Sequence, residues 1–176
     1  MSLPRTFIGF SGADIEHYWR MLGWKANEHI DFDFADFQLE RKVNSESESY
    51  IKERIRPKIR YSDVYALLIG QDTWSKETFV KWEVEVAIEK GCRLVGINLN
   101  HSTVPDEWCP WFFRNVSAVF VSYSPHIIHH ALSTFDPQAI GPDTWYYYPP
   151  EVYRQLGYGF EGNRALWVPA PKPWLR

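Results

Sequence analysis

One acidic residue interrupts the apolar side of a helical pattern near the middle of the chain. Residues 79–90 repeat at about 100° per residue, the spacing of an amphipathic helix. Glu83 falls between Phe79 and Ala87, whereas the other glutamates of the segment fall on its polar side. A carboxylate among apolar neighbours costs free energy unless it is paired or hydrated. Glu83 is therefore either an ion-pair or capping residue, or an acid that lines a cleft. The predicted core side of this helix consists of Val80, Val84, Ala87 and Ile88.

The turn after the first predicted strand carries a serine. Its sequence, Gly9-Phe10-Ser11-Gly12-Ala13, comes close to the G-x-S-x-G elbow of some hydrolases, but alanine replaces the last glycine. That hydrolase fold also needs several strands before the elbow, and only one can precede Ser11. The turn lacks G-x-G-x-x-G, and G-x-x-x-x-G-K-[ST] occurs nowhere in the chain. The turn can still present backbone N–H groups and a hydroxyl to a phosphate.

Two groups of metal-binding side chain types lack the pattern of a metal site. The aspartates of residues 31–36 begin like a calcium-binding loop, but Asp36 and Lys42 stand where that loop needs Gly and Glu. His126 and His130 could share one helical face, yet no Asp or Cys completes a ligand set. We expect no metal at either place.

Short apolar segments and helical patterns alternate along the first 136 residues. The predicted strands are residues 6–10, 30–34, 64–69, 94–99 and 118–121. The predicted helices are residues 15–22, 51–59, 79–90 and 127–132, with Pro57 expected to kink or shorten the second and Gly91 to end the third. Segments 64–69 and 94–99 are almost wholly apolar, which favours strands buried on both faces of a parallel sheet. The prediction is an α/β domain, three-layered and doubly wound.

The composition changes at residue 137. Seven of the 12 prolines and nine aromatic residues lie in residues 137–176, where only residues 151–156 show a helical pattern. This segment is too short and too interrupted to build its own core. We therefore divide the chain into an α/β domain, residues 1–136, and a C-terminal extension, residues 137–176. So much aromatic surface predicts that the extension packs on the domain or forms a subunit contact in a homo-oligomer.

The overall charge and hydropathy exclude several classes of protein. Nineteen basic and 22 acidic side chains give a formal net charge of −3, which provides no broad basic surface for a nucleic acid. No apolar run approaches the roughly 20 residues that span a bilayer, and the first residues do not form a signal peptide. Cys92 and Cys109 are too few for a disulfide framework. We expect a cytoplasmic protein that binds neither nucleic acid nor membrane.

Two segments resemble the motifs of TIR domains. Residues 7–14, Phe-Ile-Gly-Phe-Ser-Gly-Ala-Asp, resemble the first motif, an apolar strand followed by Ser and then Asp. Residues 68–83, from Leu-Ile-Gly through Thr73 and Ser75 to Phe-Val-Lys-Trp-Glu, resemble the segment that carries the TIR catalytic glutamate. The likeness is to the TIR-like proteins of bacterial Thoeris anti-phage systems, and it covers roughly residues 5–123.

The resemblance implies a flavodoxin-like three-layer sheet and an enzyme that cleaves the nicotinamide–ribose bond of NAD⁺. In the Thoeris branch the ADP-ribosyl product is cyclised into a diffusible signal that activates a separate effector protein. The resemblance places Glu83 as the catalytic residue, with Phe10 and Ser11 facing the same cleft and Asp33 and Trp82 as substrate contacts. NAD⁺ is then the substrate, and no further cofactor is expected.

The sequence also departs from the TIR pattern. Gly9 stands where a serine is often found, and the Arg-Asp-x-x-Pro-Gly loop of adaptor TIR domains is missing after the second predicted strand. Residues 35–49 would have to form the substrate lid in its place. Two alternatives to the NAD⁺ enzyme are a non-catalytic TIR-like interaction module and a nucleoside transferase or glycosidase of similar topology.

Overall fold

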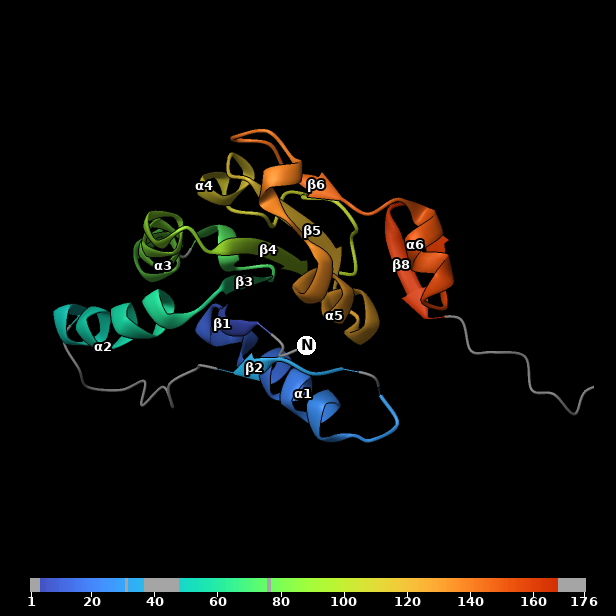
Figure 1. Ribbon diagram of the computed structural model, residues 1–176, viewed down its shortest axis with the longest axis horizontal. Coiled ribbons are helices and arrows are strands. Elements are labelled where there is room, and N and C mark those ends of the chain that lie inside the picture. The colour runs from blue at the N-terminus through green and yellow to red at the C-terminus, as the bar shows by residue number, and fades with distance from the viewer. Residues whose placement is uncertain (1–3, 31, 37–47, 76, 168–176) are drawn as a thin grey trace, which may run out of the picture.

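The computed structural model describes residues 4–30, 32–36, 48–75 and 77–167. Six parallel strands form one sheet in the order β2-β1-β3-β4-β5-β6 (Figure 1). They are β1 (Arg5–Gly9), β2 (Ala35–Asp36), β3 (Val64–Ile69), β4 (Arg93–Asn98), β5 (Ala118–Ser122) and β6 (Tyr146–Tyr147). Every residue of β3 and β5 is buried, as their apolar runs predict for strands covered on both faces.

Helices cover both faces of the sheet. On one face lie α1 (Ile15–Ala26) and α5 (Pro125–Thr134), and on the other lie α2 (Glu48–Tyr61), α3 (Glu77–Lys90) and α4 (Trp111–Arg114) (Figure 1). Three short 3₁₀ turns complete the connections: η1 (Gly12–Asp14), η2 (Thr73–Ser75) and η3 (Pro137–Ala139). Strand order 2-1-3-4-5 is that of the flavodoxin-like fold, so the predicted fold class is confirmed. Among the described residues, none of the helices combines the length and the apolar character that crossing a membrane requires.

Three local predictions differ from the structure. The second strand is β2 and covers only Ala35–Asp36, although Phe32 and Phe34 are buried as the alternation predicted. Pro57 does not shorten α2, which continues past it to Tyr61, with Ile55 and Ile59 on either side packed into the core.

The third difference lies in α3, whose buried side is rotated about the helix axis relative to the predicted buried side. Ile88 is 48% exposed, whereas Glu83 and Val86 are buried. Gly91 ends this helix as expected, with a φ of 79° that only glycine adopts without strain.

The C-terminal extension adds to the main sheet and core. Beyond β6 it forms α6 (Pro150–Gln155) and an antiparallel hairpin of β7 (Tyr158–Glu161) and β8 (Arg164–Trp167), which lie together beside the main domain in Figure 1. Tyr153 is fully buried in the cluster under α1 and α5, and its hydroxyl accepts a hydrogen bond from the Ser122 backbone N–H at 3.2 Å. Residues 157–162 match G-x-G-x-x-G, but they lie in the hairpin rather than between a strand and a helix.

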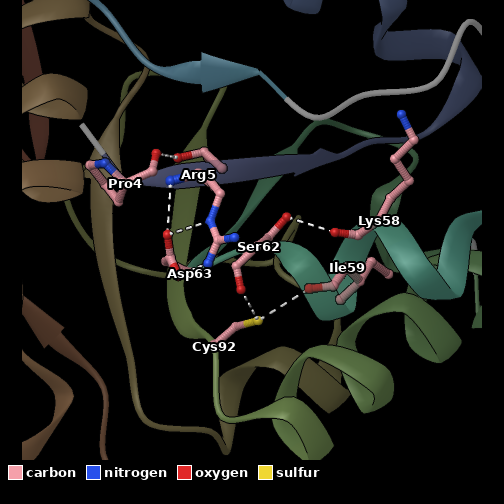
Figure 2. A network of polar contacts seen from close by, with 8 residues as sticks. Pro4, Arg5, Lys58, Ile59, Ser62, Asp63 and Cys92 are labelled. Carbon is pink, nitrogen blue, oxygen red and sulfur yellow. Dashed lines mark hydrogen bonds and ion pairs between the residues drawn. The ribbon is translucent and has the colours of Figure 1, made fainter. Parts of the chain in front are cut away.

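Polar contacts hold the strands together at the amino edge of the sheet (Figure 2). Arg5 donates from its backbone N–H and its guanidinium to the Asp63 carboxylate, at 2.8–3.1 Å. Ser62 Oγ donates to the Lys58 carbonyl at 2.9 Å, and the Cys92 thiol lies 3.4 Å from the Ser62 carbonyl. These contacts join the starts of β1, β3 and β4 to the end of α2.

Candidate active site

Glu83 is fully buried between α3 and the sheet. The Tyr65 hydroxyl donates a hydrogen bond to Glu83 Oε2 at 3.1 Å. Tyr65 is the second residue of β3, and its ring stacks on that of Phe7 at 6.0 Å between centroids. The helical periodicity placed Glu83 at the edge of the apolar side, but the structure places it inside the core, hydrogen-bonded to a strand residue.

Gly9 lies directly against this pair. A Cβ atom at Gly9 would lie 2.1 Å from the Tyr65 hydroxyl oxygen and 2.9 Å from Glu83 Oε2, so only glycine fits there without a shift. Gly9 is the last residue of β1. Glu83 therefore lies near the carboxyl end of β1, next to β3.

This position is the topological switch point of the sheet. The helix that follows β1 covers one face, and the helix that follows β3 covers the other. In open parallel sheets, ligands bind outside the carboxyl ends of the strands at such a point. The candidate site is thus placed by topology as well as by the glutamate.

A second carboxyl group lies at the same edge of the sheet. Asp14 is buried, and its Oδ2 lies 3.4 Å from Thr73 Oγ1, which in turn accepts a hydrogen bond from the Gly70 backbone N–H at 2.8 Å. A Cβ atom at Gly70 would lie 2.3 Å from Asp14 Oδ1, which shows how closely the carboxyl group approaches the end of β3. Burial raises the pKa of the Asp14 carboxyl group above its ordinary value.

The structure places Ser11 at this edge but turns Phe10 away from Glu83. Ser11 is buried and caps η1, accepting a hydrogen bond from the Ala13 backbone N–H at 3.4 Å. Phe10 is packed in the core on the α1 face, with its ring 5.1 Å from that of Tyr18. Because neighbouring residues of a strand point to opposite faces, Phe10 cannot share the face on which Gly9 meets Glu83.

Asp33 and Trp82 are not brought to the site either. Asp33 precedes β2, whose first residue pairs with Arg5 at the start of β1, so it lies at the amino edge of the sheet. Its carboxylate forms an ion pair with Lys25 at 3.0 Å. Trp82 lies against α2, with the charged groups of Lys52 and Arg56 5.5 and 5.6 Å from its ring.

Sequence reasoning did not identify three features of the site: the hydroxyl of Tyr65, the close packing at Gly9, and the contact of Asp14 with Thr73. Tyr65 belongs to an apolar run in which a tyrosine reads as one more core residue. Asp14 and Thr73 were noted in the motifs, but 59 residues separate them and only the fold makes them neighbours.

The sequence predicted no metal site, and the two histidines considered as ligands, His126 and His130, have aromatic neighbours. His126 Nδ1 lies 3.1 Å from the Tyr158 hydroxyl, and the His130 ring lies 4.9 Å from that of Tyr148. Within the described ranges, His, Cys, Asp and Glu side chains form no group of three that could hold a metal ion. Asp31 and the side chain of Asp36 lie outside the described residues, as does most of the predicted lid at 35–49.

The buried carboxyl group of Glu83, held by Tyr65, suits a reaction that builds positive charge on the substrate. A carboxylate held in a site of low polarity interacts with a developing cation far more strongly than it would in water. The Tyr65 hydrogen bond fixes the direction of the Glu83 carboxyl group and removes the need to reorganise it during the reaction.

The chain matches one family model and resembles several solved structures. Residues 7–104 match the family model described as "Thoeris protein ThsB, TIR-like domain". A conserved protein from Enterococcus faecalis V583, known from its crystal structure, shares 16% identity, with a TM-score of 0.41 over 60% of this chain and 70% of that chain. No curated protein matches the chain.

Proposed function

Because the chain belongs to the family of Thoeris ThsB TIR-like domains, we propose that it cleaves the nicotinamide–ribose bond of NAD⁺ with Glu83 as the catalytic residue. The observation that supports this most is the position of Glu83. Its carboxyl group is buried beside Gly9 at the switch point of the sheet, within the segment that the family model matches. Burying a carboxyl group at that position costs free energy, so fold stability alone does not explain why an acid stands there.

The proposed reaction uses the carboxylate to stabilise a cation. As the glycosidic bond breaks, its electron pair leaves with nicotinamide, and positive charge develops on the ribose. Glu83 would stabilise this charge and hold the ribose hydroxyls. A nucleophile of the ADP-ribose itself then attacks the same carbon and loses a proton, which closes a ring. Water attacking instead gives linear ADP-ribose.

The biological setting follows from the same proposal. The cyclic product would diffuse to a separate effector protein and activate it as part of anti-phage defence. NAD⁺ is the only small molecule that the scheme requires, with no further cofactor. We propose that the protein works in the cytoplasm, where NAD⁺ is supplied, and that it forms a homo-oligomer.

A direct test follows nicotinamide release from NAD⁺ by the purified chain and its Glu83→Gln variant. We expect the variant to lose at least about 100-fold in kcat, the scale at which removing one stabilising group acts. Glu85→Gln, on the exposed side of the same helix, is the matched control and should keep wild-type activity. Equal rates for wild type and Glu83→Gln in an active preparation would refute the assignment. Free nucleosides offered in place of NAD⁺ separate this activity from that of a nucleoside glycosidase.

One observation favours a second candidate function, a TIR-like interaction module without catalysis. Glu83 is completely buried and already hydrogen-bonded by Tyr65, as a structural carboxyl group would be. In that case neither the wild-type protein nor Glu83→Gln should cleave NAD⁺. The substitution should then only lower the melting temperature. A melting curve measured beside the activity assay distinguishes the two functions.

A further inference from the structure

Two histidine rings from separate segments pack against Tyr123 at the carboxyl edge of the sheet, and Arg20 and Arg164 lie within electrostatic range of one of them, His101. His17 and Arg20 lie one turn apart on α1, His101 follows β4, and Arg164 begins β8. The His17 and His101 rings lie 5.2 and 6.2 Å from the Tyr123 ring. We call these four basic residues the basic cluster.

Hydrogen bonds fix the extension to the loop that carries His101. Arg164 Nε donates to the Asn100 carbonyl at 3.0 Å, and the Ala165 backbone N–H donates to the His101 carbonyl at 3.1 Å. His101 itself has a φ of 65°, a left-handed conformation that a residue with a side chain adopts only when its surroundings enforce it. Hairpin and loop therefore hold Arg164 and His101 in one fixed arrangement.

The other three members of the cluster disfavour a positive charge on His101. The pKa of His101 is lowered, first by burial and then by Arg164, Arg20 and His17. Within the described part of the chain, neither Arg20 nor Arg164 forms an ion pair. Asp14 is the acidic group that interacts with His17, and its own pKa is raised by burial. In a chain of net charge −3, the permanent charges of Arg20 and Arg164 thus meet near neutral imidazole donors at the ligand-binding edge of the sheet.

We infer that the basic cluster binds the diphosphate group of a nucleotide, and that the C-terminal extension completes the substrate site by supplying Arg164. That the nucleotide is NAD⁺ or its ADP-ribosyl product rests on the proposed function. Arginine presents a planar fork of N–H donors that matches two phosphate oxygens, and Arg20 and Arg164 approach the cluster from different elements. The cluster also lies beside the first turns of α1, whose dipole favours an anion.

The test measures binding of two probes, ADP-ribose and inorganic pyrophosphate, to the full chain by calorimetry at low and at physiological salt. Arg164→Gln and Arg20→Gln should each weaken both probes about tenfold or more and make binding less dependent on salt. Arg154→Gln is the matched control, because this arginine lies on the same extension, forms its ion pair with the exposed Glu151 at 3.2 Å and stacks over the Phe160 ring, away from the basic cluster. Melting curves show whether each variant is folded, and Arg164→Lys, which keeps the charge, should bind better than Arg164→Gln.

The outcomes separate this inference from the proposed function. Affinities for both probes that are unchanged in Arg164→Gln and Arg20→Gln would overturn the inference, as would a wild-type chain that binds neither probe at millimolar concentration. Nicotinamide release that depends on Glu83 in such a chain would leave the proposed function standing alone. The converse result is a wild-type chain that does not cleave NAD⁺, with both variants losing pyrophosphate binding. That result would support the diphosphate site and refute the proposed enzymatic activity.

Discussion

Replacing Gly9 by alanine tests how closely β1 approaches the Tyr65–Glu83 pair. The new Cβ would lie 2.1 Å from the Tyr65 hydroxyl oxygen and 2.6 Å from the ring carbon that bears it. A carbon and an oxygen that are not bonded need roughly 3.3 Å or more. The strand or the tyrosine must therefore move by roughly 1 Å, and Glu83 Oε2, 2.9 Å from the same Cβ, must adjust as well.

The expected loss of stability follows from the cost of overpacking a core, about 1–3 kcal/mol. In a chain of this size each kcal/mol lowers the melting temperature by about 2–4 °C, so Gly9→Ala should melt roughly 2–12 °C below wild type. A displacement of roughly 1 Å at a catalytic group also costs about 100-fold in rate. If the proposed activity is present, Gly9→Ala should lose it more severely than it loses stability.

The measurement is a thermal melt followed by circular dichroism, with nicotinamide release measured on the same samples. Gly23→Ala is the control, since its added Cβ meets nothing within 4 Å in α1, and it should stabilise the helix by about 0.5–1 kcal/mol. Adding Tyr65→Phe to Gly9→Ala removes the atom nearest the new Cβ, so the double variant should lose less stability than the two single losses together. A Gly9→Ala protein with wild-type melting and activity would refute the close approach.

Four further predictions concern other parts of the molecule. The raised pKa of Asp14 means that its protonated carboxyl group contributes stability at low pH, and that this contribution is lost as the pH rises through the folded pKa. Asp14→Asn should therefore gain stability relative to wild type as the pH rises from 3 to 7, measured by urea titration. The opposite sign holds for Asp63, whose pKa is lowered chiefly by hydrogen bonds from Arg5. Its contribution is present above the unfolded value of 3.8 and is lost as the pH falls through the lowered folded pKa, so Asp63→Asn should be less stable than wild type at pH 6 and the difference should shrink as the pH falls below 3.8. Burial raises the pKa of Cys109 to about 12, so its thiol should react with iodoacetamide at pH 8 roughly a hundredfold or more slowly in the native protein than in urea. Burial also raises the pKa of Cys92, whose thiol should likewise react more slowly in the native protein. Deleting residues 137–176 uncovers the buried side that the extension now covers and should cause aggregation in light scattering, whereas an unchanged, monodisperse α/β domain would contradict the packing.

Much of the fold could be predicted because local patterns reflect the burial of whole elements. Residues 64–69 and 94–99 are almost wholly apolar, and they lie in the two central strands, β3 and β4. The segment 30–34 shows the limit of such reasoning: its alternation predicted burial correctly, but the hydrogen-bonded ladder begins only at Ala35. Pairing depends on the partner strand, which periodicity does not contain.

The sequence by itself determined the α/β class, the order of the main elements and the choice of Glu83 as the acid that an apolar helix side does not explain. The tertiary structure decided what surrounds Glu83, because Tyr65 and Gly9 reach it through strand pairing across long stretches of chain. It also separated residues that the motifs had grouped: Phe10 turned to the other face, and Asp33 lies at the opposite edge. Side-chain direction and strand register fix these positions, and both are set only when the strands align in the sheet.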